Sequence, residues 1–363
     1  MQFTLVAGDF MQSEEFRAIK TILQEHGHTT RAFLVDGKNP TFTDEEVSEV
    51  VRRSDFVLLA VSNSFGETLR AGQVAEEQSV PFGIYAASAP GCYLGVNLVP
   101  LRVSAKLVFV FNDDEISPAE ELFPNAIAVA SGSPNWEKFH FPELTRAEAR
   151  EKLAASEDEV LILVPGDKDL ILNILLFSLT IEAAGIMVGE ERRQVQVVIG
   201  LHPGDLNPIS SYTDLGRLVP AGVSVTFICR EAPESVPEGM NLKVFPTPHA
   251  LPGADVLVTF VSTMGFEAAC QRIPVICFFP GYGLTWFNSE SNGKEWEQCR
   301  NGTAVPIYGS SPLQLAEQMI LILTPGSDVP SLLSLRQEEF YPKPTEKGSV
   351  VRVIAKSLEN FQS

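Results

Sequence analysis

The feature that most constrains this chain is an alternation of strand and helix patterns that runs once, breaks, and runs again. In the first run, short apolar segments predict strands at residues 3–7, 30–35, 55–61, 81–86, 107–111 and 126–130. Amphipathic helices are expected between the first four strands, at residues 14–25, 44–53 and 68–78. Alternation of this kind implies parallel strands joined by right-handed crossovers, so the first run predicts a Rossmann-like α/β domain.

A charged segment, residues 144–159, separates the two runs and marks the expected domain boundary. After it, strands are expected at residues 160–164, 195–201, 223–229, 242–245, 255–261 and 274–279, and helices at residues 170–184, 265–271 and 313–323. The sequence therefore predicts two doubly wound α/β domains, residues 1–145 and 155–338, with a ligand cleft between them. A last amphipathic helix, residues 345–363, is expected to cross back onto the first domain.

The composition limits which binding partners and which cellular compartment are expected. The formal net charge is -19, and an acidic surface repels a phosphate backbone, so nucleic acid is not an expected partner. The five cysteines form no C-x-x-C pair, which favours reduced side chains in a cytoplasmic protein. No basic region precedes the first apolar run, and the apolar runs read as strand-sized. Neither a signal peptide nor a transmembrane segment is therefore expected.

The segment at residues 254–281 carries the clearest chemical signal. A buried strand leads into a small turn and then a helix, and the turn consists of Ser262, Thr263, Met264 and Gly265. Ser262 or Thr263 can cap the helix and leave backbone N–H groups facing an anion, while Glu267 can accept hydrogen bonds from ribose hydroxyls. The alternative is an ordinary capped helix whose acid lies in solvent near the positive end of the helix dipole. The local pattern leaves both interpretations open.

This segment resembles the C-terminal half of GT-B-type proteins, the superfamily that contains nucleotide-sugar glycosyltransferases and UDP-N-acetylglucosamine 2-epimerases. The matching features are the strand-ending Ser262, the helical Glu267-Ala268 and the strand led by Pro274-Val275. The resemblance spans nearly the whole chain, because further segments match: Gly27-His28, Gly132-Ser133-Pro134 and Phe340-Tyr341-Pro342. It implies that Ser262 to Gly265 contact a diphosphate and that Glu267 contacts the ribose.

Two further residues join the predicted binding site because they follow strands. The resemblance places His202, in the segment LHPGD, at the cleft, where it would donate to a phosphate or to the donor sugar. The alternative is a turn residue whose ring is satisfied by local backbone. Gly281, in a loop at residues 280–283, would let a ligand approach the carboxyl end of the sheet closely, and a plain flexible loop is the alternative.

Sugar transfer also needs a base that activates an acceptor hydroxyl. Asp9, after the first strand, and Glu67, after the third, are the candidate carboxylates, and His202 is the third predicted catalytic residue. Each acid is otherwise a capping or solvated side chain. No metal or bound cofactor is expected, because Asp113-Asp114 lacks D-x-D spacing and the five histidines form no cluster.

The resemblance leaves three functions open. The similar epimerases carry an acid after the third strand and another after the fourth, whereas the segments AVSNSFGET and IYAASAPGC offer only Glu67. The leading hypothesis is therefore a metal-independent glycosyltransferase that uses a UDP-sugar and an acceptor that the sequence does not identify. The second is an enzyme similar to UDP-N-acetylglucosamine 2-epimerase. The third is a catalytically silent protein that binds a nucleotide or a protein partner.

Overall fold

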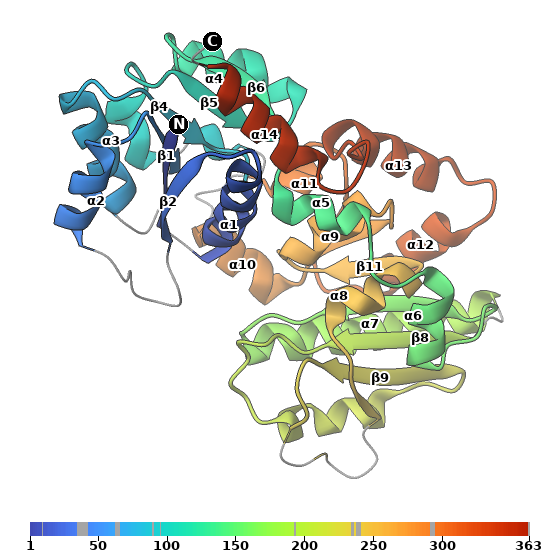
Figure 1. Cartoon of the computed structure of the whole chain (residues 1–363). Coiled ribbons are helices and arrows are strands. Elements are labelled where there is room, and N and C mark those ends of the chain that lie inside the picture. The colour runs from blue at the N-terminus through green and yellow to red at the C-terminus, as the bar shows by residue number, and fades with distance from the viewer. Residues whose placement is uncertain are drawn as a thin grey trace. The chain divides into compact units, whose positions relative to one another are not determined.

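A computed structural model shows that the chain divides into two compact units (Figure 1). One contains Met1–Phe141 together with Lys343–Ser363, and the other contains Pro142–Pro342. Each unit is built on its own parallel sheet. The structure describes residues 1–8, 10–34, 43–61, 66–88, 91–94, 96–191, 194–233, 236, 241–290 and 295–361.

The first unit is a six-stranded parallel sheet in the order β2-β1-β3-β4-β5-β6. Its strands are β1 (Gln2–Ala7), β2 (Thr29–Leu34), β3 (Phe56–Ala60), β4 (Phe82–Tyr85), β5 (Leu107–Val110) and β6 (Ile127–Ala130). Its α-helices are α1 (Phe10–Glu25), α2 (Asp44–Val51), α3 (Glu67–Glu77), α4 (Ile116–Leu122), α5 (Pro134–His140) and α14 (Ser349–Asn360). Short 3₁₀ turns are η1 (Cys92–Leu94), η2 (Val96–Leu101) and η3 (Asp113–Glu115).

Two hydrophobic cores hold this sheet between its helices. On one face, Phe16 and Ile19 of α1 and Ile354 of α14 are buried against the strands. On the other face, Val47 of α2 and Val74 of α3 are buried in the same way. Because both faces are covered, the strands read as nearly continuous apolar runs, which is the pattern that made them predictable.

The C-terminal helix α14 belongs to the first unit. At its start, Glu137 of α5 accepts a hydrogen bond from the Val350 amide at 3.2 Å. Near its end, Glu359 contacts Nδ1 of His26 at 2.8 Å. His26 and Gly27 follow the last residue of α1, and Gly27 has a φ of +85°, a conformation that favours glycine. Both ends of α14 are therefore tied to helices of the first unit.

The second unit is a seven-stranded parallel sheet in the order β10-β9-β8-β7-β11-β12-β13. Its strands are β7 (Val160–Pro165), β8 (Val195–Gly200), β9 (Val223–Cys229), β10 (Leu242–Val244), β11 (Val256–Thr259), β12 (Val275–Phe279) and β13 (Val305–Tyr308). Its α-helices are α6 (Arg146–Leu153), α7 (Leu170–Glu191), α8 (Thr247–Ala250), α9 (Thr263–Cys270), α10 (Gly281–Glu290), α11 (Glu297–Arg300), α12 (Pro312–Leu323) and α13 (Asp328–Phe340). Its 3₁₀ turns are η4 (Ile209–Leu218) and η5 (Leu251–Gly253). The sequence patterns did not predict β13, α8, α10, α11 or α13.

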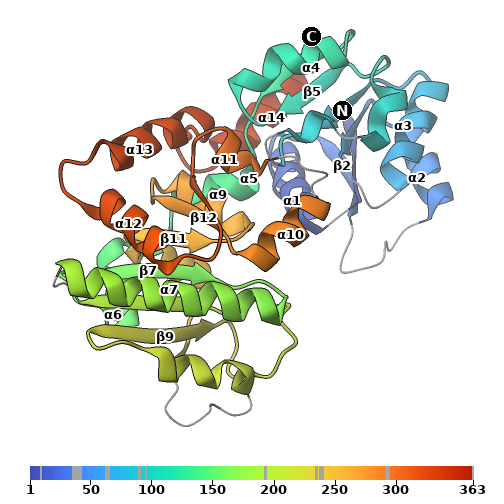
Figure 2. The ribbon, with the colours of Figure 1, turned by 180° about the vertical axis from the view of Figure 1, so that it is seen from behind.

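Helix α7 corrects the expectation that every apolar run is strand-sized. By length and composition alone, Leu170–Glu190 could cross a membrane: its mean hydropathy is 2.0, and 50% of the tested window is buried. Figure 2 shows α7 lying along one face of the second sheet. Its buried side chains, among them Leu176, Phe177 and Ile181, belong to the core of that unit, and α12 packs beside it. A helix between a sheet and another helix is apolar over most of its circumference, so a core helix passes the same test.

A buried arginine fixes the entry into the second unit. Arg150 of α6 is 1% exposed, and its guanidinium donates to the Asp255 carboxylate at 3.3 Å. It also donates to three backbone carbonyls, those of Ser156, Glu159 and Gly253. Arg146, one turn earlier, contacts the same carboxylate with a side chain that is 46% exposed. These bonds tie α6 to η5 and to the start of β11.

Candidate functional site

The carboxyl edge of the second sheet gathers most of the predicted binding residues. The strand order reverses at β7, with β8 to β10 on one side and β11 to β13 on the other. In open α/β sheets, ligands bind outside the carboxyl ends of the strands at such a switch point. His202 follows β8, Ser262 follows β11 and Gly281 follows β12. This edge is therefore the candidate functional site.

The turn after β11 opens α9 through a side-chain cap. Ser262 has an extended backbone, with φ −141° and ψ 143°, and its hydroxyl accepts the Met264 amide at 3.2 Å. The Gly265 amide donates to the Ser262 carbonyl at 3.0 Å. Two of the amides expected to face an anion are thus bonded already. Within the described residues, the Thr263 amide has no acceptor, which leaves it available to an anion.

Met264 and Gly265 are packed inside the unit. Met264 is 8% exposed, and Gly265 is buried. A Cβ placed on Gly265 would lie 2.3 Å from Oε1 of Gln298, whose side chain is fully buried. Packing against Gln298 therefore accounts for this glycine. A ligand at this turn would meet the exposed Thr263 before either of the two buried side chains.

Glu267 follows Thr263 by one helical turn, so the two side chains share a face of α9. Thr263 is exposed and Glu267 is half-buried, whereas Phe266 and Ala268 are buried. The shared face combines the hydroxyl and the available amide of Thr263 with the Glu267 carboxylate, of which Oε2 is buried. Such a face can hold a phosphate at Thr263 and a pair of sugar hydroxyls at Glu267.

His202 lines a pocket of 420 Å³ together with Tyr212 and Arg230. Its Nδ1 accepts the Gly204 amide at 2.8 Å, so the proton of the neutral ring lies on Nε2, which can donate it. A Cβ placed on Gly204 would lie 3.1 Å from Nδ1 of His202 and 3.0 Å from Cε of Lys168. The lysine chain therefore passes beside the histidine, and the site combines a ring donor with two cations.

A buried hydrogen-bond network joins the loop after β7 to the loop after β8. The Tyr212 hydroxyl donates to the Asp205 carboxylate and accepts from Nδ2 of Asn173 at 3.0 Å. Asn173, in the first turn of α7, also donates to the Asp167 carbonyl at 2.8 Å. Burial raises the pKa of Tyr212, and its bond to Asp205 raises it further. This network was not predicted from the sequence, although Asp205 belongs to the same LHPGD segment as His202.

Gly281 begins helix α10, where the sequence predicts a loop. Its amide donates to the Ser310 hydroxyl at 3.0 Å, which ties the carboxyl end of β12 to that of β13. A Cβ placed on Gly283 would lie 2.9 Å from Leu172 and 3.0 Å from Phe260. The loop assignment is therefore wrong, and Gly283 is explained by the close packing of α10 on α7 and on the turn after β11.

The two acids predicted as catalytic bases belong to the first unit. Asp9 lies outside the described residues. Glu67 is the first residue of α3, but its side chain is outside the described part of the structure, as are residues 62–65 after β3. Both assignments stay predictions.

A carboxylate that the sequence analysis missed lies at the carboxyl edge of the first sheet. Glu15 of α1 is 0% exposed; its Oε2 accepts the Ser88 hydroxyl at 2.6 Å, and its Oε1 accepts the Ser133 hydroxyl. Burial, and then the nearby charge of Glu15, raise the pKa of Tyr85 well above its usual range. Ser88 follows β4, so α1 supplies a carboxylate to a segment that has none of its own. The sequence did indicate that Glu15 is buried, because Glu15 lies one turn before Ile19 on the apolar face of α1.

Comparisons with known proteins identify the fold. A scan against protein-family models finds no match, and a search of curated protein sequences finds none. Among solved structures, the chain is similar to UDP-GlcNAc 2-epimerase from Neisseria meningitidis bound to UDP-GlcNAc, with a TM-score of 0.62, 14% identity, and coverage of 99% of this chain and 100% of that chain. It is also similar to UDP-GlcNAc 2-epimerase from Methanocaldococcus jannaschii, with a TM-score of 0.61, 10% identity, and coverage of 99% and 100%.

A third similar structure is MurG from Acinetobacter baumannii, with a TM-score of 0.55, 12% identity, and coverage of 99% of each chain. Identity this low carries information about fold alone. Together with the two parallel sheets, these likenesses confirm the predicted GT-B-type pair of Rossmann-like units.

Proposed function

We propose that this chain is a nucleotide-sugar-dependent glycosyltransferase that binds a UDP-sugar at the carboxyl edge of its second sheet. The observation that carries the proposal is the start of α9 beside the switch point, where an exposed Thr263 and a half-buried Glu267 share one face of the helix. The fold supports the same ligand class, since it is shared with structures named for UDP-GlcNAc 2-epimerases.

In this proposal the start of α9 holds the diphosphate. The Thr263 amide and hydroxyl donate to a phosphate oxygen, and the positive end of the helix dipole stabilises its charge. Glu267, one turn further, accepts hydrogen bonds from the ribose hydroxyls. His202 donates from Nε2 to the diphosphate or to the sugar, with the ammonium of Lys168 nearby.

The chemical step needs no metal in this scheme. The acceptor hydroxyl gives its proton to a carboxylate, for which Asp9 and Glu67 are the candidates, and its oxygen bonds to the anomeric carbon of the sugar. The bond between that carbon and the diphosphate breaks, and the electron pair leaves with UDP. The start of α9 and the His202 ring stabilise the charge that develops on this leaving group.

An epimerase is the second candidate, and Glu15 favours it. Epimerisation at a sugar carbon needs acids and bases in fixed positions. The segment after β4 has no acid in its sequence, but the Glu15 carboxylate reaches Ser88 there. Glu15 is fully buried, so it would act by positioning the Ser88 hydroxyl.

Product analysis with UDP-GlcNAc separates these functions. A transferase releases UDP when a suitable acceptor is added, whereas an epimerase forms the C2 epimer or releases UDP with a glycal. Neither product, together with intact UDP binding, would favour the catalytically silent alternative. In an active preparation, Asp9→Asn should suppress turnover while UDP affinity is kept, and normal turnover in that variant would exclude Asp9 as the base.

A further inference from the structure

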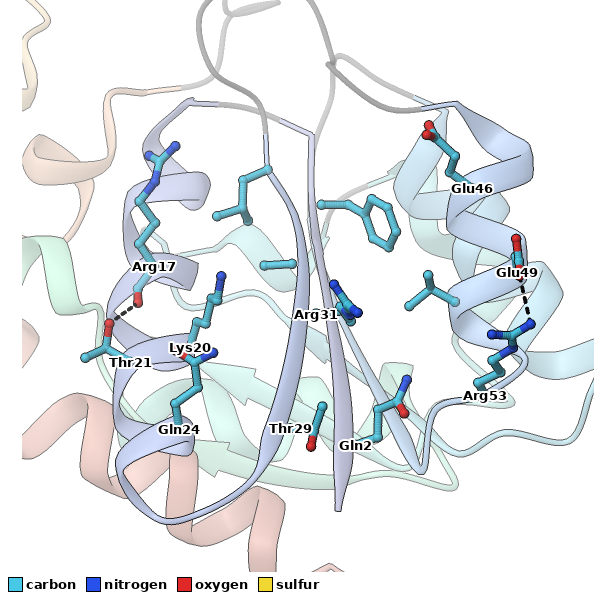
Figure 3. A pocket seen from close by; sticks show the side chains of 14 residues that line it. Gln2, Arg17, Lys20, Thr21, Gln24, Thr29, Arg31, Glu46, Glu49 and Arg53 are labelled. Carbon is cyan, nitrogen blue, oxygen red and sulfur yellow. Dashed lines mark hydrogen bonds and ion pairs between the residues drawn. The ribbon is translucent and has the colours of Figure 1, made fainter.

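A groove runs along the open edge of the first sheet, at strand β2. β2 is the end strand and pairs with β1 alone. Helix α1 walls one side of this edge and α2 walls the other (Figure 3). The groove has a volume of 970 Å³, large enough for an extended peptide segment.

The backbone of β2 has unpaired hydrogen-bonding groups that face this groove. The Thr29 amide donates to the Met1 carbonyl at 2.9 Å, so the backbone of Thr29 faces β1. Because backbone direction alternates along a strand, the amides and carbonyls of Thr30, Ala32 and Leu34 point the other way, toward the open edge. Such a row of groups is a template for one more strand.

Positive side chains line the groove on both sides. They are Arg17 and Lys20 on α1, Arg31 on β2 and Arg53 on α2, against the two acids Glu46 and Glu49 on α2. The α1 wall therefore carries cations and no lining acid, in a chain whose formal net charge is -19. This local excess of positive charge opposes the charge of the whole molecule.

Two of the four cations, Lys20 and Arg31, are available to a ligand, whereas the other two contact glutamates. Arg53 contacts Glu49 of the same helix at 2.8 Å, and Arg17 contacts a neighbouring glutamate on α1. Among the described residues, neither Lys20 nor Arg31 has an acidic partner within ion-pair distance. Lys20 and Arg31 can therefore pair with carboxylates that a ligand brings to the edge.

We infer that this edge binds an extended acidic segment of a partner protein, which adds to the sheet as a strand beside β2. Main-chain hydrogen bonds to Ala32 and its outward-facing neighbours supply affinity, as in other cases of strand addition. Alternate side chains of the added strand point toward α1, where carboxylates meet Lys20 and Arg17. The remaining side chains point toward α2, where apolar groups pack on Phe33 and Val50.

Pairing between two copies of this edge is disfavoured. If β2 of one copy paired with β2 of another, the Arg31 side chains would be brought close together, and facing like charges destabilise a sheet. The same charges protect the edge against random association. An acidic strand avoids this repulsion, and its carboxylates meet Lys20 and Arg17 on the α1 wall, which is why the partner is inferred to be acidic.

Fluorescence anisotropy with labelled peptides tests the inference on the intact chain. The probe is a capped peptide of alternating Glu and Val, and the controls are a Lys/Val peptide and a Glu/Val peptide with a central proline. The Glu/Val probe should bind, both controls should not, and rising salt should weaken binding. UDP should leave probe binding unchanged, so loss of nucleotide binding and loss of peptide binding would be separate results.

Two groove variants and one matched control locate the interaction. Lys20→Glu should weaken probe binding by about tenfold or more, because it places a negative charge on the α1 wall, against the carboxylates of the peptide. Ala32→Pro removes an outward amide and leaves the pairing with β1 intact, so it should also weaken binding. Arg217→Glu, at an 81%-exposed side chain of the second unit, makes the same charge change outside the groove and should bind the probe normally.

The inference fails if the Glu/Val probe does not bind the parent chain, or if Lys20→Glu binds it as tightly as Arg217→Glu does. Light scattering gives an independent check. A dimer of the parent chain that dissociates in Ala32→Pro would show that a second copy occupies the edge, and it would overturn the inference of an acidic partner.

Discussion

Replacing Tyr212 with phenylalanine tests whether the buried network stabilises the loops of the candidate site. The ring is 1% exposed, and the substitution nearly conserves volume, so the loss comes from the hydroxyl. A hydrogen bond to a charged group contributes about 1.5–3 kcal/mol. Asp205 would keep other donors, Asn173 at 3.3 Å and the Asn207 amide at 3.0 Å. We therefore expect the lower end of the range, about 1.5 kcal/mol, which corresponds to roughly 3–6 °C in melting temperature for a unit of this size.

Tyr282→Phe is the matched control. Tyr282 belongs to the same unit and donates to Asp169 at 3.2 Å, but its side chain is 43% exposed, so water can replace the lost bond. Its melting temperature should stay within about 2 °C of the parent value, as for most surface substitutions. Differential scanning fluorimetry of both variants beside the parent gives the comparison. Equal shifts in the two variants would refute the argument that burial makes the Tyr212 network important.

Three further predictions concern stability. Gly265→Ala should lower the free energy of unfolding by about 1–2 kcal/mol, because the new methyl group would lie 2.3 Å from a buried glutamine oxygen. Gly281→Ala has room for the methyl group and should change thermal stability little. Equal melting temperatures of the two variants would contradict this prediction. Arg150→Met should lower the free energy of unfolding, measured in urea, by about 3–5 kcal/mol, because it leaves a carboxylate and three carbonyls without their donor. Arg146→Met, at a more exposed side chain, should lower it by less than about 1 kcal/mol. Since burial raises the pKa of Tyr212, this tyrosine ionises in the unfolded chain from about pH 10 and stays protonated in the folded one, so it makes stability fall as the pH rises above 10. Tyr212→Phe should lose less stability over that alkaline range, and an identical pH dependence would contradict the assignment.

Local patterns predicted the fold because both sheets are buried on two faces. The apolar run at β9, Val223–Cys229, matches its expected bounds, and α9 begins within two residues of its expected start. Ser262 was one of two expected caps, and its hydroxyl does accept an amide of the first turn. The end of α7 was predicted less well, since the helix continues from the expected end at Ala184 to Glu191.

The details of the sites depend on contacts between residues far apart in the sequence. Glu15 meets Ser88 across 73 positions and Ser133 across 118, so no local window contains the cluster. Gly265 appeared to be a small residue that admits a ligand, but Gln298 fills the space beside it. A glycine in the sequence indicates that another group approaches the backbone closely, but it does not identify that group.

Isothermal titration calorimetry of UDP into the intact chain tests the central claim most directly, namely that the start of α9 and Glu267 hold a nucleoside diphosphate. The account predicts that UDP binds the parent chain without added metal and that Glu267→Gln weakens binding by about 1–3 kcal/mol, or roughly 5- to 150-fold. Glu317→Gln, which changes an exposed acid on α12, should bind UDP like the parent. Absence of UDP binding to the parent, or unchanged affinity in a folded Glu267→Gln variant, would contradict the account.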